Sequence, residues 1–142
     1  METKFLSSLI TEHLVDNRYI KLYLPFNYYS KSLKQEIRIP ANFICDFESV
    51  PLLKGSSKRG GVIHDYFCRK DSIPLVTKQE AANLYFEAQE CKDKKRKLKY
   101  GFVSRFRLFC TRYLKVIVVR VAWGYFHKHN VLSTLEEVSG EK

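Results

Sequence analysis

The chain lacks the cysteine patterns that bind structural metals or form a disulfide framework. Its four cysteines, at positions 45, 68, 91 and 110, are widely spaced. They form no Cys-x-x-Cys pair and no Cys/His cluster at zinc-finger intervals. We therefore expect separate buried thiols, as in a reducing cytosol. The sequence also has no internal repeat and no low-complexity tract.

Long apolar runs are missing as well. The most apolar stretch, Val116 to Phe126, is interrupted by Arg120 and is too short to span a bilayer. Residues 1–10 lack the basic start, the apolar core and the small-residue cleavage site of a signal peptide. We predict a protein with no transmembrane segment that is not secreted by a signal peptide.

Acidic residues are scarce in the C-terminal third. The formal net charge of +10 comes from 25 Lys and Arg against 15 Asp and Glu. Residues 92–130 hold 12 of the basic residues and one acidic residue, so the rest of the chain is close to neutral. This uneven charge indicates either a solvated helix face or a surface that meets an anionic partner.

Strand patterns occur in the N-terminal half. Residues 19–24 are rich in aromatic and aliphatic side chains, and residues 35–39 alternate polar and apolar before Pro40. The aromatic and polar residues 26–32 between them are typical of a connection. We expect a short antiparallel sheet or hairpin of two or three strands, preceded by an arm or short helix over residues 1–17.

Helix patterns follow. The Gly- and Ser-rich residues 54–61 indicate a flexible connection into a helix over residues 62–70. Thr77 and Glu80 have the spacing of a capping box, which predicts a second helix that runs to about Cys91.

A third helix is predicted from Tyr100 onward. Apolar residues recur there at three- and four-residue intervals, and most of the Arg and Lys residues fall elsewhere on the helix. The helix would be long, basic and amphipathic, with a polar tail over residues 131–142 behind it. With 45% hydrophobic residues, the 142-residue chain is long enough for one core. We predict a single α+β domain, residues 1–142, with the sheet packed against three helices.

Two short segments, residues 39–51 and 61–67, place chemically active groups among apolar residues. The first carries Asp46, and the second carries His64 and Asp65. Carboxylates and imidazoles flanked by Phe, Ile, Val and Tyr are partly desolvated, so they must be paired, bound to a metal or shifted in pKa. The sequence therefore predicts either a functional site or a set of buried structural hydrogen bonds.

The candidate catalytic residues are His64, Asp65 and Asp46, with His64 as general base and a carboxylate as its orienter. Asp46 and Asp65 are also candidate ligands of a divalent metal such as calcium. Because calcium takes about six oxygen ligands, loop carbonyls would have to complete that site. In the structural alternative, His64 bonds to Asp46 or to a backbone carbonyl. Cys68, four residues after His64 on the same helix face, is interpreted as a buried thiol.

The motif order resembles that of a small uncharacterised family common in tailed bacteriophages and prophages. The pattern is Ile-Pro-x-x-Phe-x-x-Asp-Phe-x-Ser-Val-Pro, then His-Asp-Tyr, then Thr-x-x-Glu-Ala and a basic, aromatic-rich helix, covering roughly residues 18–126. Members usually have Thr and Ala where this chain has Cys45 and Glu48. The resemblance implies a phage or prophage protein located in the host cytoplasm or the virion.

A more distant similarity concerns the His-Asp helix. A helix with His-Asp-x-x-Tyr that faces an Asp on a second helix resembles secreted phospholipases A2, in which the His activates water and the neighbouring Asp binds calcium. The resemblance would place the orienting Asp at Ala82, so that group is missing here. The glycine-rich calcium loop and the disulfides of those enzymes are absent too, which weakens the case for catalysis.

The basic segment suggests a binding surface. Its partner would be a protein or a virion assembly, the phosphates of a nucleic acid, or an anionic membrane surface. The candidate partner- or anion-binding residues are Lys92, Lys94, Lys95, Arg96, Lys97, Lys99, Arg105 and Arg112.

The sequence favours a binding role over catalysis. The leading hypothesis is an accessory or virion-associated phage protein that binds its partner through the basic C-terminal helix. One alternative is a metal-assisted hydrolase of esters or phosphodiesters with His64 as general base. Another is a phage inhibitor of a host defence system.

Overall fold

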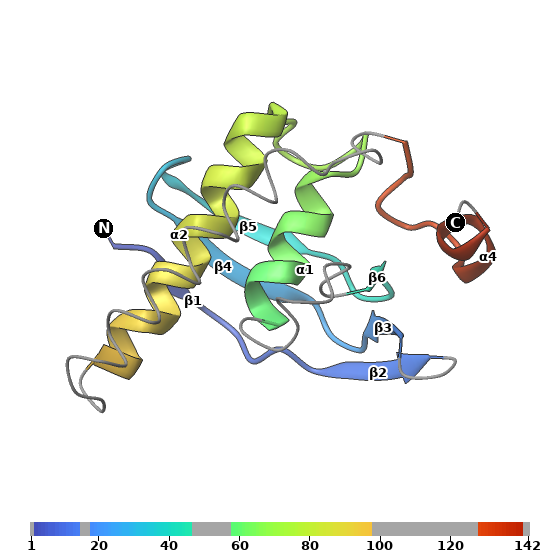
Figure 1. Cartoon of the computed structure of the whole chain (residues 1–142), viewed down its shortest axis with the longest axis horizontal. Helices are drawn as coiled ribbons and strands as arrows, with labels where there is room; N and C mark the ends of the chain where they lie inside the picture. Colours follow the sequence, from blue (N-terminus) through green and yellow to red (C-terminus); the bar gives the residue numbers. More distant parts are fainter. Residues whose placement is uncertain (1, 15–17, 47–57, 98–127, 141–142) are drawn as a thin grey trace.

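The computed structural model describes residues 2–14, 18–46, 58–97 and 128–140, and for residues 92–97 it describes the backbone alone. Within these ranges the chain forms six strands and three helices. The strands make two small antiparallel sheets, and two of the helices pack against them (Figure 1). The class is α+β, as predicted.

The first sheet has the strand order β1-β4-β5, where β1 is Lys4–Phe5, β4 is Phe26–Ser30 and β5 is Gln35–Ile39. The predicted strand over residues 35–39 is confirmed. The connection predicted for residues 26–32 is wrong over β4, which pairs with both neighbours. Alternate residues of β4 are buried, so aromatic and small polar side chains together form a half-buried strand.

The second sheet has the order β2-β3-β6, where β2 is Thr11–Leu14, β3 is Tyr19–Leu22 and β6 is Ile44–Cys45. The prediction of a strand beginning at residue 19 is confirmed. Residues 1–17 do not form a short helix in their described part, because β1 and β2 pair there with β4 and β3. Strand pairing overrides the near-helical spacing of the apolar residues.

Helix α1 spans Lys58–Phe67, four residues earlier at its start than the predicted range. Gly60 and Gly61, expected in a flexible connection, lie inside the helix and are buried. Tertiary packing therefore outweighs the low helix propensity of glycine here.

Helix α2 spans Lys78–Lys97, and its predicted capping box is confirmed. The Thr77 N–H donates to Glu80 Oε2 at 2.7 Å, and the Glu80 N–H donates to Thr77 Oγ1 at 3.2 Å. The helix continues six residues past its expected end at Cys91. Lys and Arg are good helix formers, so the charged run extends the helix and does not interrupt it.

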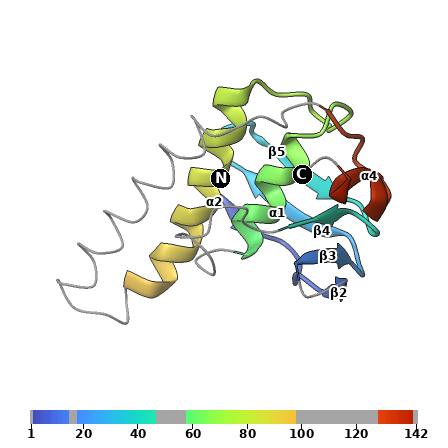
Figure 2. The same cartoon turned by 45° about the vertical axis from the view of Figure 1, so that its right-hand side comes forward.

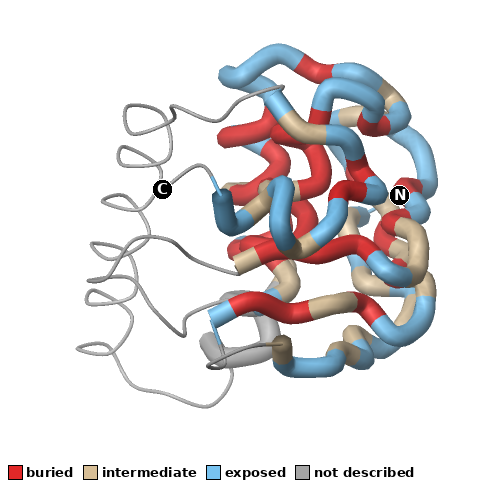
Figure 3. Tube along the Cα trace, turned by 90° about the vertical axis from the view of Figure 1, so that its right-hand side faces the viewer, coloured by how far each residue is buried: buried red, intermediate tan, exposed pale blue. Residues whose placement is uncertain are grey.

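The main core lies between the sheets and the pair α1 and α2, which lie side by side over the strands (Figures 1 and 2). The tube coloured by burial shows buried stretches of several neighbouring segments of the chain in this interior (Figure 3). Strands β3, β4 and β5 contribute Ile20, Leu22, Phe26, Tyr28, Ile37 and Ile39. The helices contribute Val62, Ile63, Tyr66, Phe67, Ala81, Leu84 and Ala88.

The long basic helix expected from Tyr100 onward falls on residues 98–127, outside the described part of the chain. The last described helix, α4 (Leu135–Ser139), is short and carries two glutamates. The predicted polar tail is anchored in its described part. Val131 is buried, and its N–H donates to Asp71 Oδ1 at 2.6 Å. Among the described residues, no helix is both long and apolar enough to cross a bilayer.

Candidate functional site

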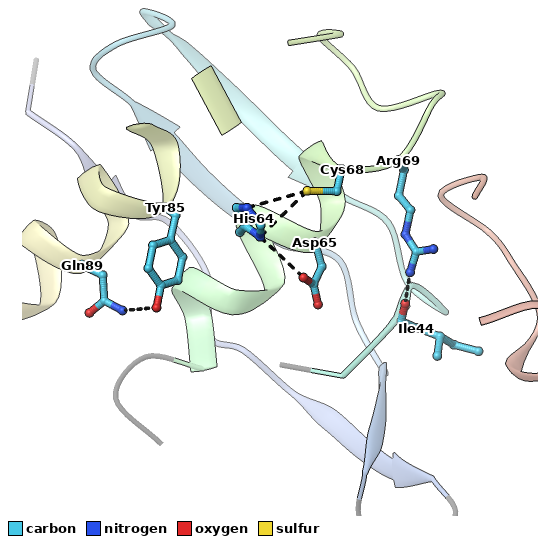
Figure 4. A network of polar contacts seen from close by, with 7 residues as sticks. All are labelled: Ile44, His64, Asp65, Cys68, Arg69, Tyr85 and Gln89. Carbon is cyan, nitrogen blue, oxygen red and sulfur yellow. Dashed lines mark hydrogen bonds and ion pairs between the residues drawn. The ribbon is translucent and has the colours of Figure 1, made fainter. Parts of the chain in front are cut away.

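The two motif segments meet at one end of α1. Asp46 directly follows β6, while His64 and Asp65 lie on α1. Arg69, just after α1, links the two elements because its Nη2 donates to the Ile44 carbonyl at 2.8 Å (Figure 4). Its guanidinium also lies over the Phe43 ring, 5.4 Å from the centroid. Arg69 therefore holds the chain that carries Asp46 against the helix that carries His64.

The His64 side chain is enclosed between the two helices. The residue is only 4% exposed. Its ring and the ring of Tyr85 on α2 pack in a T-shaped arrangement, with centroids 5.7 Å apart and planes at 76°. Its Nδ1 lies 3.7 Å from Asp65 Oδ1, which is longer than a hydrogen bond, so the contact is electrostatic. The imidazole is held by packing on more than one side.

Cys68 packs against the same imidazole. Its Sγ lies 3.9 Å from His64 Nδ1 and 3.7 Å from Nε2. A sulfur nearly equidistant from both ring nitrogens cannot lie on the N–H or lone-pair axis of either. Burial raises the pKa of the Cys68 thiol, and the charge of Asp65 raises it further. The thiol stays protonated, as expected for a buried structural cysteine and not for a nucleophile.

Asp65 has the most perturbed carboxyl of this cluster. Burial raises the pKa of Asp65 above its ordinary value, and the negative charge of Asp46 raises it further. His64 and Arg69 act in the opposite direction. Asp46 therefore lies close enough to Asp65 for their charges to interact. The structure thus places Asp65 beside His64, with Asp46 within electrostatic range of Asp65.

Helix α2 adds residues that the motif analysis did not assign to the site. Gln89 Nε2 donates to the Tyr85 hydroxyl at 3.0 Å, and both residues are buried. Ala82 is fully buried in a small cluster with Tyr85 and carries only a methyl group, so this position supplies no carboxylate to orient the His. Tyr85 and Gln89 are four residues apart, as are Asp65 and Arg69. Residues four apart on a helix lie on the same face, so this spacing could have predicted both contacts from the sequence.

The described residues do not form a metal centre. No group of three or more His, Cys, Asp or Glu side chains within them is arranged to hold a metal ion. Asp46 and Asp65 supply one carboxylate each, and Glu48 lies outside the described part of the chain. Two carboxylates fall short of the oxygen set that calcium needs.

The predicted basic residues divide into two groups. Lys92, Lys94, Lys95, Arg96 and Lys97 lie on the last turns of α2. The other three, Lys99, Arg105 and Arg112, lie outside the described residues. The described basic residues are on a different part of α2 from Tyr85, the residue that contacts His64.

The match to a known family covers the elements that build the cluster. Residues 20–103 match the family described as "Protein of unknown function (DUF1353)". The chain belongs to the DUF1353 family. The DUF1353 segment extends from β3 through α2, so it includes Asp46, His64 and Asp65 together with the basic end of that helix. No curated protein and no solved structure matches the chain.

Proposed function

We propose that this DUF1353 protein acts by binding, as an accessory or virion-associated protein of a phage or prophage in the host cytoplasm or the virion. The α1–α2 pair serves as a rigid frame, and the basic end of α2 contacts an acidic partner. The order of motifs, which resembles that of phage and prophage proteins, supports the setting. The net charge of +10 supports the acidic character of the partner.

The enclosure of His64 is the observation that favours binding over catalysis. A general base must come within hydrogen-bond distance of the proton that it removes. The imidazole is almost fully buried, with the Cys68 sulfur 3.7 Å from its Nε2 and the Tyr85 ring packed against it. A structural role for the His-Asp pair accounts for these contacts without a substrate.

Replacement of His64 tests this structural role. We expect His64→Ala to lower the free energy of unfolding by about 1–3 kcal/mol, because it removes packing and leaves buried polar neighbours unpaired. Urea unfolding followed by circular dichroism measures the change. His13→Ala, at an exposed position on β2, is the matched control and should change stability by less than about 0.5 kcal/mol. Equal stability of the two variants would contradict the proposal.

A metal-assisted hydrolase is the second candidate, and the proximity of Asp46 and Asp65 beside His64 favours it. In this reaction His64 would take a proton from water, and the two carboxylates would orient the imidazole or bind a divalent metal. The test is hydrolysis of ester and phosphodiester substrates with Ca²⁺ or Mg²⁺ present. If the wild type hydrolyses a substrate and His64→Ala abolishes this activity without changing the melting temperature, the protein is a hydrolase and a purely structural role for His64 is wrong.

Inhibition of a host defence system is a variant of the binding proposal in which the acidic partner belongs to the host. Mass spectrometry of purified virions separates the two cases. Presence of the protein in the particle supports the virion role. Co-purification with a host protein, together with absence from the particle, supports inhibition.

A further inference from the structure

Charge changes sharply along α2. Its first fourteen residues, 78–91, contain one Lys and three Glu, whereas residues 92–97 contain four Lys, one Arg and one Asp. We call residues 92–97 the basic end of α2. The charge is thus concentrated within about 9 Å of helix at 1.5 Å per residue, and it follows directly on a segment of net negative charge.

Relative to the other described elements, the basic end lies beyond the part of α2 that packs on the core. The part of α2 that packs on the core contributes Ala81, Leu84 and Ala88, and buried positions continue to Gln89. Glu90 is exposed, and Cys91 is half-buried. Figures 1 and 2 both show the C-terminal end of α2 extending past the two sheets.

Helix stability accounts for only part of this charge run. Lys94, Lys95, Arg96 and Lys97 lie in the last turn of α2, where cations interact favourably with the macrodipole. Lys92 lies before that turn, and like charges follow it three and four residues later, a spacing that destabilises a helix by about 0.2–0.5 kcal/mol per pair. With five cations and one Asp, the basic end has a net charge of +4 that no acidic residue within it balances.

The composition of the basic end distinguishes between kinds of acidic partner. It contains no apolar residue, so its attraction to a lipid surface would be electrostatic alone and would lack the apolar insertion by which interfacial helices are held. Lysine is depleted in protein–protein interfaces, which depend on aromatic anchors. Interfaces with nucleic acid are strongly positive and need no apolar core, since the duplex carries one negative charge per about 1.7 Å.

From these features we infer that the basic end of α2 binds the phosphate backbone of nucleic acid without sequence specificity. This inference rests on the proposed binding function and names the chemistry of the partner. The contacts are ionic, so binding releases counterions and weakens as salt rises.

The test compares two triple charge reversals in the full chain. Lys92→Glu, Lys95→Glu and Arg96→Glu alter the basic end, while Lys4→Glu, Arg38→Glu and Lys70→Glu alter exposed cations elsewhere. Each variant lowers the formal net charge of +10 by six, so general electrostatic attraction is matched. Fluorescence anisotropy measures binding to short labelled DNA duplexes of two unrelated sequences between about 50 and 200 mM salt. Polyglutamate and phosphatidylserine vesicles are the other two probes.

We expect the basic-end variant to bind duplex DNA at least about tenfold more weakly. The slope of log K against log salt concentration should become shallower by about one unit for each lost phosphate contact. The control variant should retain most of its affinity, and the two duplexes should bind alike. If the basic-end variant is unfolded by circular dichroism, Gln replaces Glu at all six positions of the two triple variants, so that each loses three charges.

Two outcomes would overturn the inference in different ways. Binding to polyglutamate or vesicles as tight as to DNA, still dependent on the basic end, would reject nucleic acid but keep the proposed function. Equal loss in both triple variants, or no binding to any of the three probes, would reject the basic end as a contact surface and with it the proposed function.

Discussion

At the scale of single residues, the Asp65 carboxyl shows how burial and neighbouring charges set protonation in the cluster. Burial and the nearby Asp46 raise its pKa, and His64 and Arg69 offset that shift only in part. The folded protein therefore holds this proton to a higher pH than the unfolded chain, whose Asp pKa is about 3.9. Stability from this group is greatest at low pH and falls as pH rises through the folded pKa.

Asp65→Asn should remove that pH dependence. The amide has nearly the shape of the protonated carboxyl and carries no charge, so the free energy of unfolding at neutral pH should match or exceed that of the wild type. Urea unfolding between about pH 4 and pH 8 measures it, across the range in which a raised Asp carboxyl titrates. Glu36→Gln, at an exposed position on β5, should leave the curve unchanged. A variant that keeps the wild-type slope would show that another group is responsible.

At the scale of elements, the start of α2 depends on a local hydrogen-bond pair. Thr77 and Glu80 bond reciprocally, and these bonds from the Thr77 N–H and hydroxyl lower the pKa of the Glu80 carboxyl. Both residues are exposed. The stabilisation is present above the unfolded Glu pKa, about 4.3, and is lost as pH falls through the lowered folded pKa.

Thr77→Ala should therefore destabilise the protein by about 1 kcal/mol at neutral pH, the usual cost of losing an N-cap side chain. Thermal unfolding measures the change, with Thr77→Ser as the control that keeps the hydroxyl. The difference between wild type and Thr77→Ala should narrow in acid, where the Glu80 carboxylate is protonated. A difference that is the same at every pH would assign the cap to the Thr77 hydroxyl alone.

Elements that depend on a local sequence pattern could be predicted. The strand over residues 19–22 is recognisable from its composition, the strand over residues 35–39 from its alternation, and the cap at Thr77 from its spacing to Glu80. Strand β4 was missed because its buried set includes Tyr28 and Ser30, which a pattern of apolar residues does not identify. The Lys- and Arg-rich run after Cys91 does not mark the end of α2, because lysine favours helix.

At the scale of the whole molecule, one buried carboxylate joins three segments that are distant in the sequence. Glu87 of α2 accepts hydrogen bonds from the backbone N–H groups of Lys31 and Ser32, at 2.6 and 3.1 Å, in the turn between β4 and β5. It also accepts from the hydroxyls of Ser30, Ser32 and Thr3, the last next to β1. This carboxylate fixes α2 to the first sheet, and thereby the direction in which its basic end extends.

Glu87→Ala should destabilise the protein by about 3 kcal/mol, because the buried carboxylate is the shared acceptor of several part-buried backbone and hydroxyl donors, which would lose it at once. Urea unfolding measures the loss, and hydrogen exchange at the Lys31 and Ser32 amides should accelerate. Glu90→Ala, one turn further along α2 and exposed, is the matched control. Similar stability of the two variants would show that the turn is held by other contacts.

The candidate site was predictable in its members but not in its environment. Asp46, His64 and Asp65 were identified because each is an ionisable group among apolar neighbours, and the His64–Cys68 contact follows from helix spacing. The contact with Tyr85 and the link from Arg69 to Ile44 depend on how α1 packs against α2 and β6. Those contacts, and not the residue types, favour a structural role for His64.

The sequence alone determined the features that depend on neighbouring residues. These are the capped start of α2, the strands over residues 19–22 and 35–39, and the concentration of positive charge after residue 91. The enclosure of His64, the proximity of Asp46 to Asp65 and the bonds from Glu87 to the turn at Lys31 arise only when the chain folds. The physical reason is that hydrogen bonding and side-chain periodicity act over a few residues, whereas burial and pKa depend on groups that folding brings together.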